Sequence, residues 1–272
     1  MTFDPDFDTS LTAIAVPRQK RRWVKAMHHF RKLIANKEDT SQVFHITNAL
    51  NGTDLYKAFN RFLAHPEGRK RFEQRRYLPP LLDDRTRLRA MPAGSLAQAY
   101  CDFMDREGLT AQGLVDEFDS FLTDVEDNRT DAFKWYNARS RDTHDMQHVL
   151  TGYGRDALGE TSVLAYSYQQ TSGLGIQFIA YMGALEVKRW APKGAPVLGA
   201  IREAARRGKA AENIMLYDLE DLLPRPLEDV RDMLNVSPMT VYPEVHRRMR
   251  DAGLDPYEAV GGEVPDTQAL AA

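Results

Sequence analysis

Apolar residues recur at helical spacing along most of the chain, and no stretch sustains the alternation of apolar and polar residues that predicts a β-strand. The periodicity is clearest in residues 20–37, where Trp23, Met27, Phe30 and Ile34 fall on one face. Further helices are expected at 41–50, 53–64, after Gly94-Ser95, and at 111–126, 131–150, 157–189 and 197–207, with a last short helix from Pro226. We therefore expect an all-α fold, a single-domain helical bundle.

The longest of these segments, residues 157–189, is also the richest in large apolar and small side chains. Its helical pattern weakens between Gly173 and Gly175, and glutamines interrupt its apolar surface. It therefore lacks the roughly 20 continuous apolar residues that span a membrane. We expect it to form a central apolar helix, buried inside the bundle.

The composition is that of an ordinary globular domain. Of the 272 residues, 43% are hydrophobic and 28% are charged, which is enough for one sizeable core. The net charge of -3 gives no reason to expect nucleic acid as a partner. The single cysteine, Cys101, excludes an internal disulfide and is typical of a reducing compartment. The expected domain covers residues 16–257, between a disordered N-terminal tail at 1–15 and a C-terminal tail at 258–272.

Two histidines and two carboxylates lie close together in the middle of the sequence. His144 and His148 are four residues apart and so share one face of a helix, about 6 Å from each other. Asp145 shares that face, and Glu160 follows a glycine-containing stretch at 151–154 where the chain can turn back. Nitrogen and oxygen ligands without a thiolate suit zinc, iron, manganese or cobalt. The other interpretation is a polar network, or a pair of side chains capping a helix.

Better-known metal motifs do not fit this run. A zincin needs a glutamate after its first histidine, where this chain has Asp145. A di-iron bundle needs Glu-x-x-His from two helices, and no second such element is found. An HD-type phosphohydrolase needs a further upstream histidine, for which His45 or His65 is a candidate. That activity therefore stays as one alternative.

The stretch from Tyr136 to Glu160 resembles the signature of the Coq4 family of ubiquinone-biosynthesis proteins, which is H-D-x-x-H, eleven residues, then E. Residues 91–100 are similar to the family's P-x-G-S/T-L/F-x-x-A-Y segment, and residues 221–236 are similar to its P-L-x-x-V-R-x-x-L segment. Together these segments cover about residues 75–236.

The resemblance implies that His144, Asp145, His148 and Glu160 are both the catalytic residues and the ligands of one divalent metal ion, in a site between two helices. We expect zinc. The implied reaction is loss of the carboxylate from ring carbon C1 of a polyprenyl hydroxybenzoate, which makes the protein a carbon–carbon lyase. Because zinc has no redox chemistry, iron or another redox metal is expected if hydroxyl replaces the carboxylate.

The substrate of such an enzyme has an aromatic head and an isoprenoid tail. We expect the tail to occupy an apolar tunnel that begins at the metal and is lined by Leu164, Tyr168, Phe178 and Tyr181. Arg141 is expected to meet the carboxylate of the head. The alternative is that the apolar residues are only the core of the bundle.

The resemblance equally implies a second class of function, a non-enzymatic scaffold that binds lipid intermediates and other ubiquinone-biosynthesis proteins. The acidic N-terminus has no signal or transit-peptide pattern, so we expect a bacterial protein in the cytoplasm. Residues 20–37 place Trp23 among basic side chains, which favours peripheral contact with the cytoplasmic face of the inner membrane. A homodimer is expected from the resemblance alone.

Overall fold

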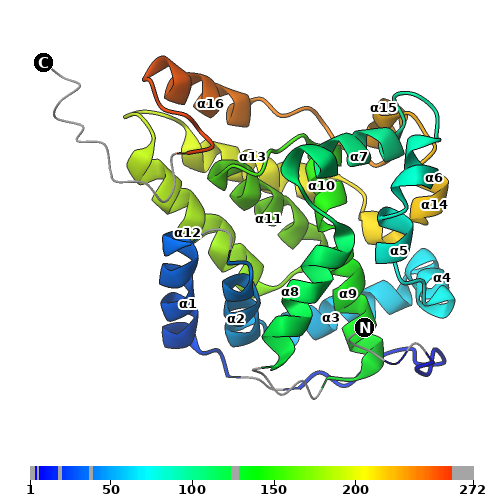
Figure 1. Cartoon of the computed structure of the whole chain (residues 1–272). Coiled ribbons are helices and arrows are strands. Elements are labelled where there is room, and N and C mark those ends of the chain that lie inside the picture. The colour runs from blue at the N-terminus through cyan, green and yellow to red at the C-terminus, as the bar shows by residue number, and fades with distance from the viewer. Residues whose placement is uncertain (1–3, 5, 18–19, 37–38, 124–128, 259–272) are drawn as a thin grey trace, which may run out of the picture.

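The computed structural model describes residues 4, 6–17, 20–36, 39–123 and 129–258, and within these ranges the fold is all-helical, as predicted (Figure 1). The N-terminal half contains α1 (Trp23–Ala35), α2 (Ser41–Leu50), α3 (Thr53–Ala64), α4 (Pro66–Gln74), α5 (Pro79–Leu82), α6 (Arg85–Arg89), α7 (Leu96–Glu107) and α8 (Ala111–Thr123). The C-terminal half contains α9 (Asp131–Asp142), α10 (His144–Thr151), α11 (Ala157–Thr171), α12 (Leu174–Trp190), α13 (Val197–Ala210), the 3-10 helix η1 (Ile214–Leu216), α14 (Leu219–Leu222), α15 (Leu227–Met233) and α16 (Val241–Asp251).

Helix α11 is the central helix of the fold. It packs against α12 and α13 and also contacts α10 (Figure 1). Its buried residues lie on more than one side of the helix and include Leu158, Val163 and Tyr166. A Cβ atom at Gly208 of α13 would lie 2.2 Å from the carbonyl oxygen of Tyr166, so the two helices cross in backbone contact. The prediction of a central buried helix is confirmed for residues 157–171.

The expected single helix over 157–189 is wrong in its length, because the chain breaks after Thr171. Ser172 and Gly173 have φ angles of 62° and 110°, which end α11. The new helix α12 is held at its start by α2 and α3, because Asn51 accepts a hydrogen bond from the amide of Gly175 at 2.9 Å. Asp54 accepts one from the amide of Leu174, also at 2.9 Å. The glycines that weaken the sequence pattern therefore mark a turn between two packed helices.

The expected helix over 131–150 is likewise two helices, α9 and α10, which meet at Thr143. The Thr143 hydroxyl donates to the carbonyl of Arg139 at 3.0 Å. Arg139 is buried and donates to the carbonyls of Met215 and Tyr217 at 2.9 and 2.6 Å, which ties α9 to η1. The break lets α10 pack against α7 while α9 packs against α3 and α8.

Two residues of the N-terminal segment, for which the sequence predicts a disordered tail at 1–15, contact the helices of the domain. Phe7 is only 8% exposed, and its ring centroid lies 5.2 Å from that of Phe72. The side chain of Asn60 pairs with both the amide and the carbonyl of Ile14, at 2.9 and 3.0 Å. An apolar anchor and satisfied backbone groups thus hold this segment on the helices. Residues 1–3, 5 and 259–272 of the two expected tails lie outside the described residues.

Helix α1 carries several basic side chains, and at its N-terminal end it carries exposed apolar ones. Phe30 is buried against α2 and α12, whereas Trp23 and Val24 are 52% and 87% exposed. The Trp23 ring contacts Phe178 of α12 at a centroid distance of 6.2 Å. Among the described residues, no helix has both the length and the apolar character to cross a membrane.

The helix crossing at Gly208 yields a stability prediction. Gly208→Ala places a methyl group against the Tyr166 carbonyl, so it should lower the free energy of unfolding by about 1–3 kcal/mol. Gly199→Ala on the same helix is the control, because its Cβ would lie 3.3 Å from Val241 and meet no backbone. Calorimetric unfolding of both variants tests this. Equal stability of the two variants would contradict the close crossing.

Candidate metal centre

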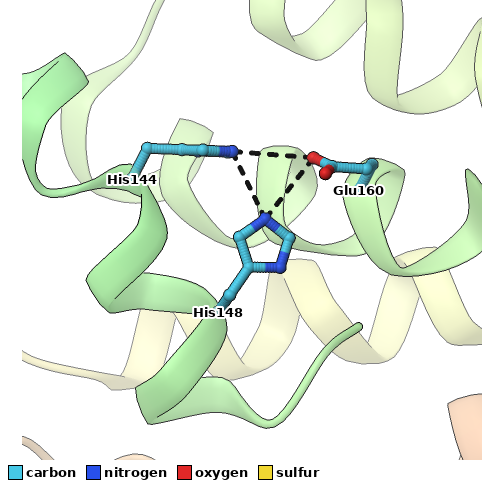
Figure 2. Close-up of side chains that lie close together, drawn as sticks. All are labelled: His144, His148 and Glu160. Carbon is cyan, nitrogen blue, oxygen red and sulfur yellow. Dashed lines mark hydrogen bonds and ion pairs between the residues drawn. The ribbon is translucent and has the colours of Figure 1, made fainter. Parts of the chain in front are cut away.

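Three side chains from α10 and α11 converge on one point (Figure 2). The Nε2 atoms of His144 and His148 lie 3.3 Å apart. The Oε2 atom of Glu160 lies 3.6 Å from the first of these nitrogens and 3.4 Å from the second. The sequence prediction that the chain turns back and brings Glu160 to the histidines is confirmed.

These separations fit a metal ion. With metal–ligand bonds of about 2.1 Å, two ligands of a tetrahedral ion lie about 3.4 Å apart. The three observed separations, 3.3, 3.4 and 3.6 Å, are close to that value. Two imidazoles and one carboxylate also form a donor set that suits zinc and other divalent first-row metals. The group can therefore hold one divalent ion and leave a fourth position for water or substrate.

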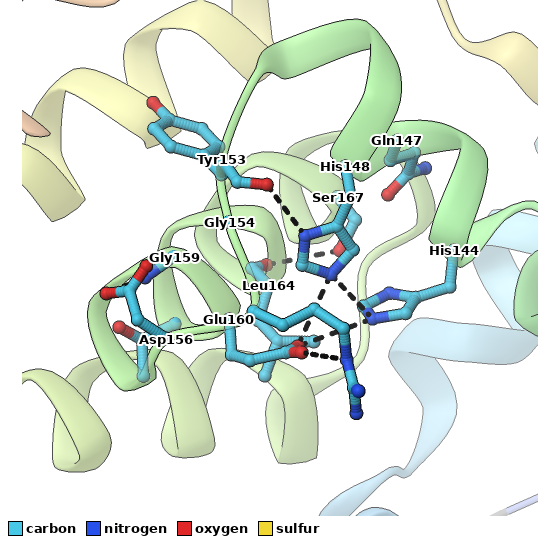
Figure 3. A network of polar contacts seen from close by, with 12 residues as sticks. His144, Gln147, His148, Tyr153, Gly154, Asp156, Gly159, Glu160, Leu164 and Ser167 are labelled. Atoms are coloured by element: carbon cyan, nitrogen blue, oxygen red, sulfur yellow. Dashed lines mark hydrogen bonds and ion pairs between the residues drawn. The ribbon is translucent and has the colours of Figure 1, made fainter. Parts of the chain in front are cut away.

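The orientation of His148 is fixed by its other ring nitrogen. Nδ1 lies 3.0 Å from the carbonyl oxygen of Tyr153, so Nδ1 carries the proton and donates it (Figure 3). The unprotonated Nε2 then presents its lone pair to the group, which is the usual arrangement of a metal-ligating histidine. The ring also stacks on Phe103 at a centroid distance of 5.3 Å.

Two arginines hold the C-terminal end of α10. Arg231 donates from Nε to the carbonyl of Leu150 and from Nη2 to that of Val149, both at 2.9 Å. Arg207 donates to the carbonyl of Thr151 at 3.1 Å. The last carbonyls of a helix lack partners within the helix, and the positive guanidinium groups favour its negative end. Both arginines come much later in the chain than α10, Arg207 on α13 and Arg231 on α15.

Glu160 lies in the first turn of α11, which Asp156 caps. The carboxylate of Asp156 accepts hydrogen bonds from the amides of Leu158 and Gly159 at 3.1 and 3.2 Å. Arg155 reaches the second oxygen of Glu160, with Nε 3.3 Å from Oε1. The glutamate thus faces the histidines with one oxygen and an arginine with the other.

The charges of the group depend on each other. Burial by itself lowers the pKa of His148, but the Glu160 carboxylate and the Tyr153 carbonyl outweigh it and raise that pKa above its ordinary value. Burial by itself raises the pKa of Glu160, but the two histidines outweigh it and hold that pKa well below its ordinary value. The group therefore favours a positive charge between the carboxylate and the imidazoles. A divalent ion would meet the same electrostatic demand, and its binding would displace the proton from His148.

The group opens onto a large cavity. The side chain of His148 is completely buried, whereas those of His144 and Glu160 are 25% and 33% exposed and line the cavity wall. The cavity has a volume of about 1030 Å³. Much of its wall is apolar and comes from α1, α2, α3, α8, α11 and α12, including Leu33, Val43, Phe44, Leu55, Phe118, Phe121, Leu164, Ile176 and Ile179. Part of the N-terminal segment, from Ile14 to Pro17, also lines it.

The structure divides the predicted site residues. Asp145 lines the cavity beside His144 but contributes no atom to the group of three. Arg141 lines the cavity, donates to Asp142 through Nε at 2.8 Å, and lies over the Phe118 ring at 5.3 Å. Leu164 lines the cavity as expected.

The other three predicted substrate contacts lie elsewhere. The lining of the cavity does not include Tyr168, Phe178 or Tyr181. Tyr168 is half-buried on α11, and Tyr181 is 41% exposed on α12. Phe178 faces α1, where its ring meets those of Trp23 and Phe30.

The upstream histidines proposed for a phosphohydrolase do not join the group. His45 stacks on His29 at a centroid distance of 4.2 Å. His65 caps α4, where its Nδ1 accepts a hydrogen bond from the amide of Glu67 at 3.2 Å. Within the described residues, the three-ligand group is the only one of its kind. The ligand pattern of that enzyme class is therefore not assembled from these residues.

Several residues that support the site or line the cavity were not predicted from the sequence. The Asp156 cap has the common Asx signature before a helix, and Arg231 lies inside the segment that resembles the family. Gln147 lies between the two histidines, lines the cavity and is 3% exposed. The contribution of α1, α2 and α8 to the cavity had no counterpart in any local motif.

In the part of the chain that the structure describes, the protein is all-helical, and a His/His/Glu group that can hold a divalent ion lies at the wall of an apolar cavity. Residues 16–240 match the family model described as "Coenzyme Q (ubiquinone) biosynthesis protein Coq4". The chain belongs to this family.

The individual relatives are more distant. The chain is 25% identical over 201 residues to the mitochondrial ubiquinone biosynthesis protein coq-4 of Neurospora crassa, covering 72% of this chain and 54% of that protein. It is 26% identical over 188 residues to the coq4 protein of Botryotinia fuckeliana, covering 67% and 61%. The chain thus spans less than two thirds of the length of either relative. The crystal structure of a putative ubiquinone biosynthesis protein from Nostoc punctiforme has the same fold, with a TM-score of 0.61 and 19% identity, and covers 80% of this chain and 100% of that one.

The geometry predicts how the protein handles metal. After dialysis the protein should retain about one divalent ion per chain, and His148→Ala should lose it because a single imidazole and a carboxylate make a poor site. The affinity should fall as the pH is lowered through the raised pKa of His148, since the proton competes with the metal. Elemental analysis and a chelator competition at several pH values measure both effects. Exposed His28 provides the matched control, and a loss of metal from His28→Ala equal to that from His148→Ala would contradict the assignment.

Proposed function

We propose that this protein acts in ubiquinone biosynthesis as a metal-dependent decarboxylase, which removes the carboxylate from ring carbon C1 of a polyprenyl hydroxybenzoate. The observation that carries the proposal is the opening of the His144/His148/Glu160 group onto an apolar cavity of about 1030 Å³. A polar reacting group at the wall of an apolar cavity suits a substrate with an aromatic acid head and an isoprenoid tail.

His144, His148 and Glu160 would hold a divalent ion, which would supply a Lewis acid to stabilise the negative charge that develops as the ring C–C bond breaks. In simple decarboxylation the bonding electrons stay on the ring carbon, which takes up a proton, and carbon dioxide leaves. Replacement of the carboxylate by hydroxyl needs an oxidant in addition, such as molecular oxygen with a redox metal. Zinc serves the first reaction, and iron or another redox metal serves the second.

The residues of the chain itself supply binding and orientation. Arg155 lines the cavity next to Glu160 and is placed to meet the carboxylate of the head. Arg141 lines the same cavity, but Asp142 engages its Nε and Nη2 atoms at 2.8 and 2.7 Å. Arg141 remains the predicted contact of the carboxylate, and Arg155, which pairs with Glu160, adds a second positive charge at this end of the cavity. Asp145, beside His144, completes the polar end of the cavity and stays a candidate fourth ligand.

The second candidate is a lipid-binding scaffold for other ubiquinone-biosynthesis proteins. Its supporting observation is that the three-ligand group joins α10 to α11, so that a metal would clamp two helices at the cavity. In that case the cavity holds the lipid without changing it. A homodimer remains a prediction for either candidate.

The two candidates differ in turnover. Protein loaded with zinc or iron should release carbon dioxide from a 3-polyprenyl-4-hydroxybenzoate, and His144→Ala should reduce the release to background while the helical circular dichroism is unchanged. The reason is that His144 is one of three ligands, on the partly exposed side of the group. Isotope-labelled carboxylate gives the measurement, with His28→Ala as the control. Tight lipid binding without release under either metal, with or without oxygen, would favour the scaffold.

The same proposal places the protein peripherally on the cytoplasmic face of the inner membrane, with α1 as the contact. The exposed side chains of Trp23 and Val24 are joined by Tyr181 and Leu185 of α12, which are 41% and 45% exposed. Helices α1 and α12 contact each other, and α1 carries the basic residues Lys25, Arg31 and Lys32. Apolar side chains among positive charges suit an anionic bilayer.

Charge reversal tests the membrane contact. Arg21 lies 3.8 Å from Asp54, so the change is better made at Lys25, Arg31 and Lys32, where replacement by glutamate should weaken binding to anionic vesicles. Each positive charge near such a surface contributes about 1 kcal/mol. The matched control reverses three charges on α13, at Arg202, Arg206 and Lys209. Equal binding by both triple variants in vesicle sedimentation would remove α1 as the contact.

A further inference from the structure

The carboxylate of Asp156 is buried at the start of α11, the helix that carries Glu160. Asp156 is 1% exposed, and besides the two amides of α11 it accepts hydrogen bonds from two residues of α16. His246 approaches one oxygen with Nε2 at 3.0 Å, and the hydroxyl of Tyr242 donates to the other. Helix α16 is about ninety residues further along the chain, at separations of 86 and 90 residues.

The hydrogen bonds of Asp156 and Tyr242 connect to the segments that carry Glu160 and orient His148. On one side, Asp156 caps the helix whose first turn carries Glu160. On the other side, the Tyr242 hydroxyl accepts a hydrogen bond from the amide of Gly154 at 3.1 Å. Gly154 follows Tyr153, whose carbonyl holds Nδ1 of His148. Three hydrogen bonds and one peptide bond thus link His148 to Asp156, and Asp156 caps the helix that carries Glu160.

The loop and the helix also touch each other directly. A Cβ atom at Gly159 would lie 2.0 Å from the carbonyl oxygen of Gly154, and one at Gly154 would lie 3.0 Å from the Tyr242 hydroxyl. Gly159 is therefore required for this close approach of two backbone segments, whereas a Cβ atom at Gly154 would meet only side chains, the nearest being the Tyr257 hydroxyl at 2.5 Å. The segment of Tyr153, which orients His148, therefore packs directly against the first turn of the helix that carries Glu160.

We propose that Asp156, Tyr242 and His246 are positioning residues, which set the separation between Glu160 and His148 for a divalent ion. The inference rests on the proposed metal site. Apolar side chains would fill this space without the cost of burying a carboxylate, an imidazole and a hydroxyl. Partners that orient metal ligands through hydrogen bonds tune the affinity of the site although they never touch the ion.

Metal affinity distinguishes a role of Tyr242 and His246 in orienting the metal ligands from a role in core packing alone. The affinity of the full-length protein for Zn²⁺, measured by chelator competition, should fall about 10- to 100-fold in Tyr242→Phe and in His246→Leu. The visible absorption of bound Co²⁺ should change as well, because the ligand geometry relaxes. His246→Gln keeps an N–H donor at the end of the side chain and should recover part of the affinity.

The control is Met249→Ala, also on α16. Met249 is 2% exposed and packs in the same core as Tyr242, but it makes no part of the carboxylate network. It should lower the melting temperature and leave the Zn²⁺ affinity within about twofold, because a distant cavity changes packing and not ligand orientation. Equal affinities in wild type and Tyr242→Phe, or an equal loss in Met249→Ala, would overturn the inference while the metal site stands. A wild-type protein that binds neither Zn²⁺ nor Co²⁺ would overturn the metal site and this inference together.

Discussion

The contact of His148 with Glu160 is the constraint on which the arrangement of α10, α11 and the turn between them depends. The two side chains belong to different helices, and their polar atoms lie 3.4 Å apart at the wall of an apolar cavity. Each would be costly to bury alone, because a charge without a partner loses its hydration. Together with His144 they contact each other, and a divalent cation would be a partner for all three. The turn between α10 and α11 therefore has to return the chain to within a few ångströms of its starting helix.

That return is supported from outside the turn. The end of α10 is bound by Arg207 and Arg231, and the start of α11 is capped by Asp156. Each of these contacts satisfies backbone groups that a short helix leaves without partners. Helix α10 has only eight residues and would be marginal by itself in water. Hydrogen bonds from other parts of the fold thus supply the stability that a longer helix would have by itself.

Local pattern was enough to predict the helices, the central position of α11 and the pairing of the histidines with Glu160, because each depends on spacing along one short segment. It failed where tertiary contacts decide the outcome. The break at Ser172 is stabilised by Asn51 and Asp54, which belong to a distant part of the sequence. Phe178 has the apolar character of a cavity residue, but helix rotation directs it towards α1. The four-ligand set that the resemblance implies includes Asp145, which lines the cavity near His144 and stays a prediction as a ligand.

The arginine contacts also bear on the order in which the protein is made. Synthesis proceeds from the N-terminus, and domains acquire structure as enough of the chain emerges. The three ligands are complete once Glu160 has been added, yet Arg207 and Arg231, which bind the end of α10, follow 47 and 71 residues later, as the residue numbers show. During that interval the ligands are present on a segment that lacks its supports. The arginine contacts at the end of α10 can therefore form only after α15 has been synthesised.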